Sequence, residues 1–534
     1  MSFKRSLLAG LAAAGLAAQA PAQAAQVEFD DASVAQLQAA MAAGTFSSEK
    51  LIELCLARIQ AYDAQGPKLH AVMALNPKAL EEARALDAER KAGKVRSPLH
   101  GIPVVFKDNF DTFDMPTTGG SVLLEGSIPP KDALVVKKLR DAGAIIFAKV
   151  NLSEFAGGAT YSSLGGQSLN PHDLARSPAG SSGGTGVSIA AGFAPLGMGT
   201  DTGGSVRGPS TANGIVGMRP SMGLLSRSGI IPLALIFDTG GPMTRNVSDI
   251  AAMLSVMVGV DPADEATKAS AGKFEKDYTK NLNAGALKGA RLGLVRDTLG
   301  RDPEVDWAIT SAVDQMKKAG ATVVDVHYPK WLLQNSRDYY NAVRWPEFPV
   351  QMKAYLATLG PKYPKSLDEM IERAEKFTTS RPDGARPNPV RWALFKQEAA
   401  SGTMQDYRYT SVRDYMLPAI RATVEGVISS NKLDALIYST SSGKTPLIAG
   451  GGGGDGGGGV SGTNVVSLAG FPDLVVPAGF TGDNLPVGIS FVGTAFTEGK
   501  LLGLGYSFEQ ATHARRRPVH TPALPGAKVE IKGG

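Results

Sequence analysis

A single serine follows a run of small residues in the segment GMGTDTGGSVRGPS, residues 197–210. Four glycines and three Thr or Asp residues occupy seven of the eight positions before Ser205. Glycine is costly to order, so a folded chain concentrates it where the backbone turns sharply or approaches another group closely. The amides of Thr202, Gly203, Gly204 and Ser205 could converge on one point here. That arrangement would stabilise an oxyanion formed when a serine attacks an acyl carbon.

A nucleophilic serine also needs a base, and the histidines do not supply one in any recognisable motif. None of the six histidines lies in an HExxH or paired-ligand spacing, and Cys55 is the only cysteine. A zinc site built from Cys and His is therefore not indicated, and we expect no metal or cofactor. Cys55 lies on the apolar face of a predicted helix, as a buried filler residue. The histidines are His70, His100, His172, His327, His513 and His520.

A rival serine occurs in Gly180–Gly184, where Ser182 stands at the centre of a G-x-S-x-G pattern. This pattern marks the nucleophile of α/β-hydrolases only when a strand precedes it. The preceding residues, LNPHDLARSPAG, are polar, contain proline and favour a turn. We therefore interpret the match as accidental.

Helical and strand patterns alternate along the chain, which predicts an α/β layered fold around one sheet. The expected helices cover about 33–43, 47–62, 77–93, 303–318 and 499–512, with two more in DALVVKKLRDAG and SGGTGVSIAAGFA. The expected strands are 69–75, 102–106, AIIFAKV, PLGMGT, RLGLV, TVVDV, DALIYS, DLVVPAG and PVGISFVG.

Residues 331–415 interrupt this alternation with helical segments broken by proline. They hold three of the four Trp and seven of the thirteen Tyr residues. One interpretation is a helical subdomain that packs its own core. The other is a wall of a substrate cleft, because aromatic side chains offer broad apolar contact to organic ligands. The glycine-rich segment 450–459 is interpreted as a flexible loop, since strand patterns continue after it.

Several stretches resemble the motifs of the amidase signature family, which includes fatty-acid amide hydrolases, peptide amidases and the A-type component of amidotransferases. AGSSGGTG followed by GTDTGGSVR resembles the signature itself, and PLHGIPVVFKDNF resembles the family's lysine motif. The resemblance extends over about residues 30–515. It implies one large α/β domain over 25–534, with a central, mostly parallel or mixed twisted sheet covered by helices. Residues 331–415 would be a helical insertion within that domain.

The family uses a Ser-Ser-Lys triad, and each member maps onto a residue of this chain. The resemblance places the nucleophile at Ser205, the base at Lys107 and the bridging serine, which follows a cis peptide bond in the family, at Ser181. The separation of 24 residues between the two serines is the one that the family keeps. The oxyanion amides fall on Thr202 to Ser205. One departure is Ala179, which replaces the glycine often found two residues before the bridging serine.

This triad predicts an amidohydrolase acting on a small-molecule amide. A lysine acts as a base only when it is neutral, so Lys107 must be buried to lower its pKa from about 10.4. It would accept a proton through Ser181 and so activate Ser205. The same relay in reverse would protonate the departing amine. An esterase or carbamate hydrolase would use the same groups and remains the main alternative, followed by the A-type component of an amidotransferase or a catalytically silent binding protein.

Neighbouring residues receive supporting roles in this interpretation. Asp201 and Arg207 flank the nucleophile and are expected to pair and brace its loop. Ser182 is expected to donate a supporting hydrogen bond. Asp108 and Asn109 are expected to anchor the turn after the predicted base.

The N-terminus has the pattern of a removed signal peptide, residues 1–24. Lys4 and Arg5 precede an apolar run from Leu7 to Ala18, and residues 22–24 form an A-x-A cleavage site. The run is too short to span a bilayer stably, so we expect an exported protein, periplasmic or secreted, without a membrane anchor. The net charge of +5 is too small and dispersed to indicate a nucleic-acid partner. The dense basic cluster HARRRPVH, residues 513–520, is interpreted as a solvated C-terminal tail.

Overall fold

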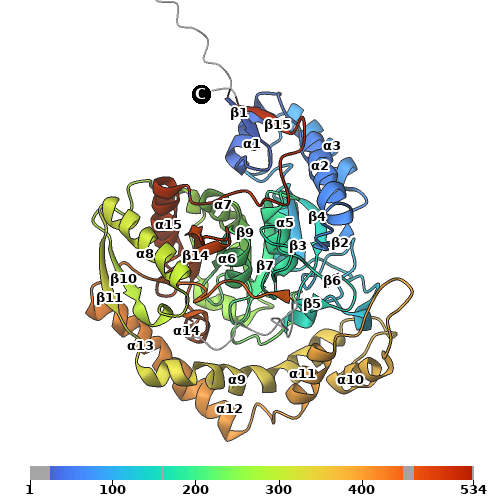
Figure 1. Ribbon diagram of the computed structural model, residues 1–534. Helices are drawn as coiled ribbons and strands as arrows, with labels where there is room; N and C mark the ends of the chain where they lie inside the picture. Colours follow the sequence, from blue (N-terminus) through green and yellow to red (C-terminus); the bar gives the residue numbers. More distant parts are fainter. Residues whose placement is uncertain (1–24, 158–159, 449–461, 532–534) are drawn as a thin grey trace, which may run out of the picture.

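A computed structural model describes residues 25–157, 160–448 and 462–531, and it is built around one sheet of eleven strands (Figure 1). In spatial order the strands are β11 (Thr322–Val326), β10 (Arg291–Val295), β12 (Ala435–Ser439), β14 (Pro486–Val492), β13 (Asp473–Phe480), β8 (Val216–Arg219), β9 (Thr239–Thr244), β7 (Leu196–Asp201), β3 (Pro103–Lys107), β4 (Ile145–Val150) and β2 (Val72–Leu75).

The sheet is mixed, as the sequence predicted. Strand β10 runs parallel to β11 and β12, and β3 runs parallel to β7 and β4. The remaining neighbours are antiparallel. Each expected strand is present, and together they form one α/β domain in which β3 and β7 are neighbouring interior strands.

The sequence patterns did not predict β8 and β9. Strand β9 has the sequence TGGPMT, and its glycines and proline are depleted in strands. It forms because it pairs with β7 along its whole length, from Leu196 opposite Thr244 to Asp201 opposite Thr239. Every residue of β9 is buried, so tertiary packing outweighs local propensity here.

Helices cover the sheet, and their ends show why the sequence forms them. In α8 (Pro303–Lys318), the side chain of Asp302 accepts hydrogen bonds from the amides of Glu304 and Val305. Pro303 occupies the first turn, where a backbone N–H would have no partner within the helix. The last turn contains two lysines, whose positive charges interact favourably with the negative end of the helix dipole. The other helices packed around the sheet are α1 (Val34–Ala42), α2 (Ser48–Ile59), α3 (Ala79–Lys91), α4 (Leu134–Asp141), α5 (Gly183–Ala190), α6 (Arg207–Ala212), α7 (Val247–Met257), α13 (Leu417–Ser430), α14 (Gly462–Ala469) and α15 (Glu498–Thr512).

The aromatic-rich region is helical and forms an arc along one side of the molecule (Figure 1). It contains α9 (Lys330–Leu356), α10 (Leu367–Lys376), α11 (Pro389–Ala399) and α12 (Tyr407–Ser411). Phe348 of α9 stacks on Phe395 of α11, with ring centroids 6.0 Å apart. Phe395 also meets the edge of Phe155, at 5.6 Å. The insertion therefore has its own core, and that core continues into the body of the protein.

The two ends of the described chain lie together. Strand β1 (Ala25–Glu28) pairs antiparallel with β15 (Lys528–Ile531). Arg515 and Arg517 form ion pairs with Asp31, at 2.8 and 2.6 Å, and Arg516 lies over the ring of Phe480. The interpretation of residues 513–520 as a solvated tail is therefore wrong, because carboxylates near the N-terminus hold the arginines against the protein.

The predicted signal peptide, residues 1–24, and the glycine-rich segment 450–459 lie outside the described residues. Over the ranges that the structure does describe, no helix is long and apolar enough to cross a membrane.

Arg58 joins the terminal segments to the body of the protein. Its side chain is fully buried and forms an ion pair with Asp30 at 3.1 Å. Its nitrogens donate hydrogen bonds to three carbonyl oxygens, of Ala191 at 2.7 Å, Thr521 at 2.9 Å and Pro522 at 3.0 Å. Helix α2, helix α5 and the C-terminal segment thus meet at one guanidinium.

We expect Arg58→Met to lower the free energy of unfolding by about 3–5 kcal/mol, because it leaves three carbonyls buried without their donor and the Asp30 carboxylate with Arg517 as its remaining arginine partner. The measurement is chemical denaturation followed by circular dichroism. Lys50→Ala is the matched control, since Lys50 pairs with Glu53 at 3.2 Å on the surface, and it should change stability by less than about 1 kcal/mol. Equal effects of the two substitutions would contradict this account of Arg58.

Candidate active site

The parallel pair β3 and β7 brings two of the predicted site residues together. Lys107 is the last residue of β3, and Asp201 is the last residue of β7. The two strands are in register from Val104 opposite Leu196 onward, so their carboxyl ends meet at the same edge of the sheet. Ligand sites in open α/β sheets commonly form at this edge.

Lys107 is completely buried and has two hydroxyl partners. Its Nζ lies 2.6 Å from Ser181 Oγ and 2.7 Å from Thr200 Oγ1. Burial lowers the pKa of Lys107 to about 7, against the opposing effect of the carboxylates of Asp201 and Asp238. A substantial fraction of this lysine is therefore neutral at neutral pH. In that form its lone pair can accept the hydroxyl proton of Ser181.

The loop before α5 brings Ser181 to the lysine. The Gly180–Ser181 peptide bond is cis, as the resemblance implied. The carbonyl of Ser181 accepts a hydrogen bond from the Ser153 amide at 3.0 Å. Ala179 has a φ of 59°, in the left-handed region, which explains why glycine is the usual residue there.

The next residue, Ser182, connects this loop to the nucleophile turn. Its amide donates to the carbonyl of Ser205 at 3.2 Å, which places Ser205 beside the Ser181 segment. The hydroxyl of Ser182 is fully buried and contacts the carbonyl and amide of Thr200, at 3.2 and 3.3 Å. Ser205 by contrast is only half-buried. Ser182 therefore supports β7, and Ser205 is the more accessible serine.

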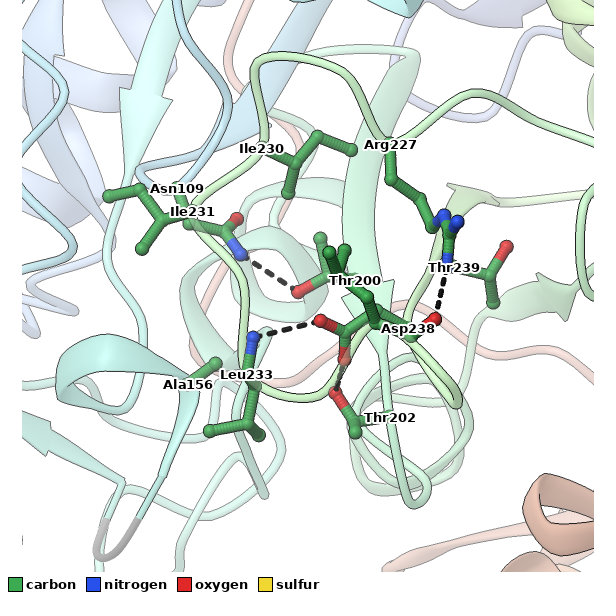
Figure 2. Close-up of a pocket in the computed structure, with 11 residues that line it drawn as sticks. Asn109, Ala156, Thr200, Thr202, Arg227, Ile230, Ile231, Leu233, Asp238 and Thr239 are labelled. Atoms are coloured by element: carbon green, nitrogen blue, oxygen red, sulfur yellow. Dashed lines mark hydrogen bonds between the residues drawn. The ribbon is translucent and has the colours of Figure 1, made fainter. Parts of the chain in front are cut away.

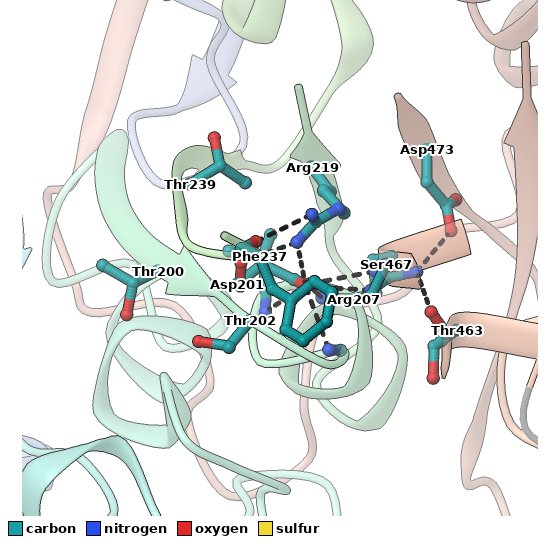
Figure 3. A network of polar contacts seen from close by, with 12 residues as sticks. Thr200, Asp201, Thr202, Arg207, Arg219, Phe237, Thr239, Thr463, Ser467 and Asp473 are labelled. Atoms are coloured by element: carbon teal, nitrogen blue, oxygen red, sulfur yellow. Dashed lines mark hydrogen bonds and ion pairs between the residues drawn. The ribbon is translucent and has the colours of Figure 1, made fainter. Parts of the chain in front are cut away.

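A buried ion network holds the turn that carries Ser205 (Figure 3). The Asp201 carboxylate contacts the guanidinium of Arg207 at 2.8 Å and that of Arg219 at 3.0 Å. Burial alone would raise the pKa of Asp201, but the two arginines lower it well below its usual range. The same carboxylate accepts hydrogen bonds from the amides of Gly204 at 2.9 Å and Val206 at 3.0 Å.

Arg207 is bound entirely within the protein and has no exposed surface. Besides Asp201, it pairs with Asp473 of β13 at 3.0 Å. It also donates to Ser467 Oγ at 2.7 Å and to the carbonyl of Thr463 at 3.0 Å, both in α14. Its role is to brace the turn, because its guanidinium is committed to these partners.

These contacts change the predicted set of oxyanion donors. The Gly204 amide was predicted to be an oxyanion donor, but it already donates a hydrogen bond to Asp201 and is therefore not available to a substrate oxygen. The amides of Gly203 and Ser205 have no acceptor among the described residues. The Thr202 side chain is held by Asp238, whose Oδ1 accepts its hydroxyl proton at 2.6 Å. That contact leaves the Thr202 amide without an acceptor as well, so three predicted amides stay available among the described residues.

A small pocket opens next to this turn (Figure 2). Its polar side includes Asn109, Thr200, Thr202 and Asp238, and its apolar side includes Ile230, Ile231 and Leu233. The side-chain amide of Asn109 donates to Thr200 Oγ1 at 3.0 Å. Asn109 therefore reaches the partner of the lysine, whereas the sequence assigned it only to the following turn.

Asp108, the other residue of that turn, has the anchoring position that the sequence suggested. Its carboxylate accepts hydrogen bonds from the amide and hydroxyl of Thr118 and forms a buried ion pair with Lys149 at 3.0 Å. Asp108 therefore has no contact with Lys107 Nζ.

Sequence reasoning missed Thr200, Arg219 and Asp238. Thr200 stands inside the quoted motif, and its place just before Asp201 was the available signal. Arg219 ends β8 and Asp238 directly precedes β9, and no local pattern pointed to either strand. Cys55 is buried, and burial raises the pKa of its thiol to about 12, which suits a filler residue. In the part of the chain that is described, no group of three or more His, Cys, Asp or Glu side chains could hold a metal ion.

Comparison with known proteins agrees with this geometry. A model of the Amidase family matches residues 50–502. The chain belongs to the Amidase family. This amidase is accordingly an amide-hydrolysing enzyme.

Several relatives of this amidase match it over nearly its whole length. A probable amidase of Arabidopsis thaliana is 34% identical over 504 residues, covering 92% of each chain. The A-type component of the glutamyl-tRNA(Gln) amidotransferase of Myxococcus xanthus is 36% identical and covers 92% of this chain and 99% of its own. The crystal structure of the peptide amidase of Stenotrophomonas maltophilia is 36% identical, with a TM-score of 0.84 over 92% of this chain and 99% of the other.

Proposed function

We propose that this amidase cleaves the C–N bond of a small-molecule amide through a serine acyl-enzyme. Ser205 is the nucleophile, Ser181 the bridging hydroxyl and Lys107 the base. The observation that carries the proposal is the buried contact of 2.6 Å between Lys107 Nζ and Ser181 Oγ, at a lysine whose pKa is lowered to about 7. A base of that pKa suits proton transfer near neutral pH.

Acylation follows from this arrangement. Neutral Lys107 accepts the proton of Ser181, and Ser181 in turn accepts the proton of Ser205. The Ser205 oxygen then bonds to the amide carbon, and the negative charge that develops on the carbonyl oxygen is stabilised by amides among Thr202, Gly203 and Ser205. As the C–N bond breaks, the lysine proton returns through Ser181 to the departing nitrogen. The products of this step are a free amine and an ester of Ser205.

Deacylation repeats the relay with water. A water molecule loses its proton through Ser181 to Lys107, and its oxygen attacks the ester carbon. The C–O bond to Ser205 breaks, and the serine regains a proton from the relay. The carboxylic acid is released, and the enzyme returns to its starting protonation state.

Esters and carbamates present the same carbonyl to Ser205, so an esterase or carbamate hydrolase is the alternative chemistry for this triad. The A-type component of an amidotransferase would also use it, and the Myxococcus xanthus relative carries that name. The proposed export of this protein favours an independent hydrolase. It is supported by Lys4 and Arg5 before the apolar run of 7–18 and by the A-x-A pattern at 22–24.

The pH dependence of kcat/KM tests the base. Only neutral Lys107 accepts a proton, and the neutral fraction grows as pH rises through about 7, so kcat/KM should rise along one limb and then level off. Lys107→Ala should lower kcat/KM by about 10² to 10⁴ and flatten this limb. Steady-state rates of the folded variants between acid and alkaline pH provide the measurement.

Serine variants identify the nucleophile in the same preparation. Ser205→Ala should abolish the covalent acyl-enzyme seen by mass spectrometry. Ser182→Ala is the matched control and should still form the adduct, because its hydroxyl contacts only the backbone of Thr200. Undiminished turnover in folded Lys107→Ala, or an adduct in Ser205→Ala, would disprove the proposed triad.

Leaving-group variation tests the common intermediate. The substrates are a primary amide, an anilide and an ester that carry one acyl group, together with a carbamate. With added hydroxylamine, the first three should partition between acid and hydroxamate in the same ratio, since each forms the same ester of Ser205. A ratio that changes with the leaving group would rule out a shared acyl-enzyme. Hydrolysis of the ester or carbamate without the amides would favour the alternative chemistry.

Expression in a Gram-negative host tests export. The mature protein should be recovered from the periplasm or medium, with the mass of a chain that begins at Ala25. Replacing Lys4 and Arg5 with Glu should leave the full-length chain in the cytosol, because the positive n-region is lost. Full-length, unprocessed protein in the cytosol of cells that express the unaltered sequence would contradict the proposal.

A further inference from the structure

An aromatic pair lies against the turn that carries the nucleophile. A Cβ placed on Gly203 would stand 3.1 Å from both Cζ and the hydroxyl oxygen of Tyr340, so the phenol ring packs on the backbone at this glycine. The ring stacks on Phe237, with centroids 5.3 Å apart and planes inclined by 23°. Phe237 is 1% exposed, whereas Tyr340 is only half-buried. Tyr340 is thus the ring of the pair that has exposed surface beside the turn.

Both rings are fixed relative to the turn. The carbonyl of Phe237, labelled in Figure 3, accepts a hydrogen bond from Arg219 at 2.8 Å, and Arg219 also holds Asp201. The neighbouring amide of Ile236 donates to the carboxylate of Glu347 in α9, at 3.2 Å. Helix α9, which carries Tyr340, is therefore tied to the same loop. A platform held in this way is rigid enough to discriminate between bound groups.

The relay defines which half of the substrate faces this platform. The departing amine must lie near Ser181, because Ser181 returns the proton to it. The residues packed around the Ser181 segment are Ser153 and Ser205, by backbone hydrogen bonds, whereas Tyr340 packs on Gly203. The platform therefore borders the turn that supplies the oxyanion amides. When the carbonyl oxygen occupies the oxyanion amides and the amine faces Ser181, the acyl group is the remaining part of the substrate that can meet the ring.

We infer that Tyr340, stacked on Phe237, is a specificity-determining residue that contacts the acyl group of the substrate. The substrate class is an amide whose acyl part carries a planar aromatic group close to the carbonyl. Such a group can stack or pack edge-on against the phenol ring. This inference rests on the proposed function and names the part of the substrate that the aromatic-rich insertion recognises.

The tryptophan Trp392, which shares the insertion with Tyr340, has a different environment. It packs edge-on against Phe377 at 5.6 Å and lines a separate surface groove between α10 and α11. Tyr339, next to Tyr340, meets Trp331 with ring centroids 6.5 Å apart. The aromatic content of the insertion thus divides into one ring at the nucleophile turn and others that pack elsewhere.

The test compares the acyl preference of the full-length enzyme with and without this ring. The substrates are phenylacetamide and acetamide, together with their methyl esters, which share the acyl groups but change the leaving group. In Tyr340→Ala and Tyr340→Leu, the ratio of kcat/KM for phenylacetamide over acetamide should fall by about fivefold to tenfold, the size of one lost aromatic contact. The ester pair should show the same fall. Tyr340→Phe and the neighbouring control Tyr339→Ala should keep the original ratio.

Other outcomes would overturn the inference. A common loss across all four substrates in both Tyr340 variants, with a lower thermal midpoint, would show that the ring is only structural. The same fall in Tyr339→Ala would show that the effect is not local to the nucleophile turn. A change in the amide-to-ester ratio at constant acyl group would place the ring on the leaving-group side. Ser205→Ala distinguishes a failure of the proposed function from a failure of this inference. Activity retained in Ser205→Ala refutes the proposed function. Activity lost in Ser205→Ala, together with an unchanged phenylacetamide-to-acetamide ratio in the Tyr340 variants, refutes only this inference.

Discussion

The buried Asp201 carboxylate is the interaction on which the active site depends. Asp201 is the last residue of β7. Its carboxylate pairs with Arg207 and Arg219 and accepts hydrogen bonds from the amides of Gly204 and Val206 in the turn that follows. Removing one member of a buried ion network leaves the others without a counter-charge in a medium of low dielectric constant, which is strongly unfavourable. The network therefore couples the shape of the Ser205 turn to β8, β13 and α14, which lie far apart in sequence.

Burial resolves a conflict at the lysine. A carboxylate close to Lys107 raises the pKa of the ammonium group, whereas the proposed chemistry needs the neutral amine. Burial outweighs the carboxylates of Asp201 and Asp238, so the pKa of Lys107 falls to about 7. The ion network thus braces the turn, whereas burial tunes the base.

Much of the sheet could be predicted because its strands carry continuous apolar runs, as in AIIFAKV of β4. The motif residues Lys107 and Ser181 could also be assigned, and they lie in contact. Strand β9 could not, since TGGPMT becomes a strand only through its pairing with β7. Asp238 was missed because it belongs to the site only through a tertiary contact, the hydrogen bond from the Thr202 hydroxyl. Arg515 and Arg517 were misjudged for the same reason: their partners, Asp30 and Asp31, lie far away in the sequence.

The pairing of β1 with β15 has a consequence for the order of folding. A ribosome completes β1 long before it reaches β15, so the emerging N-terminal strand has no partner while most of the chain is being made. The buried hydrogen bonds of Arg58 also cannot all form early, because two of the acceptor carbonyls, at 521 and 522, are synthesised late. Contacts of such long sequence separation form slowly and close a loop of nearly the whole chain. The central sheet can assemble first, and the meeting of the two ends then completes the molecule.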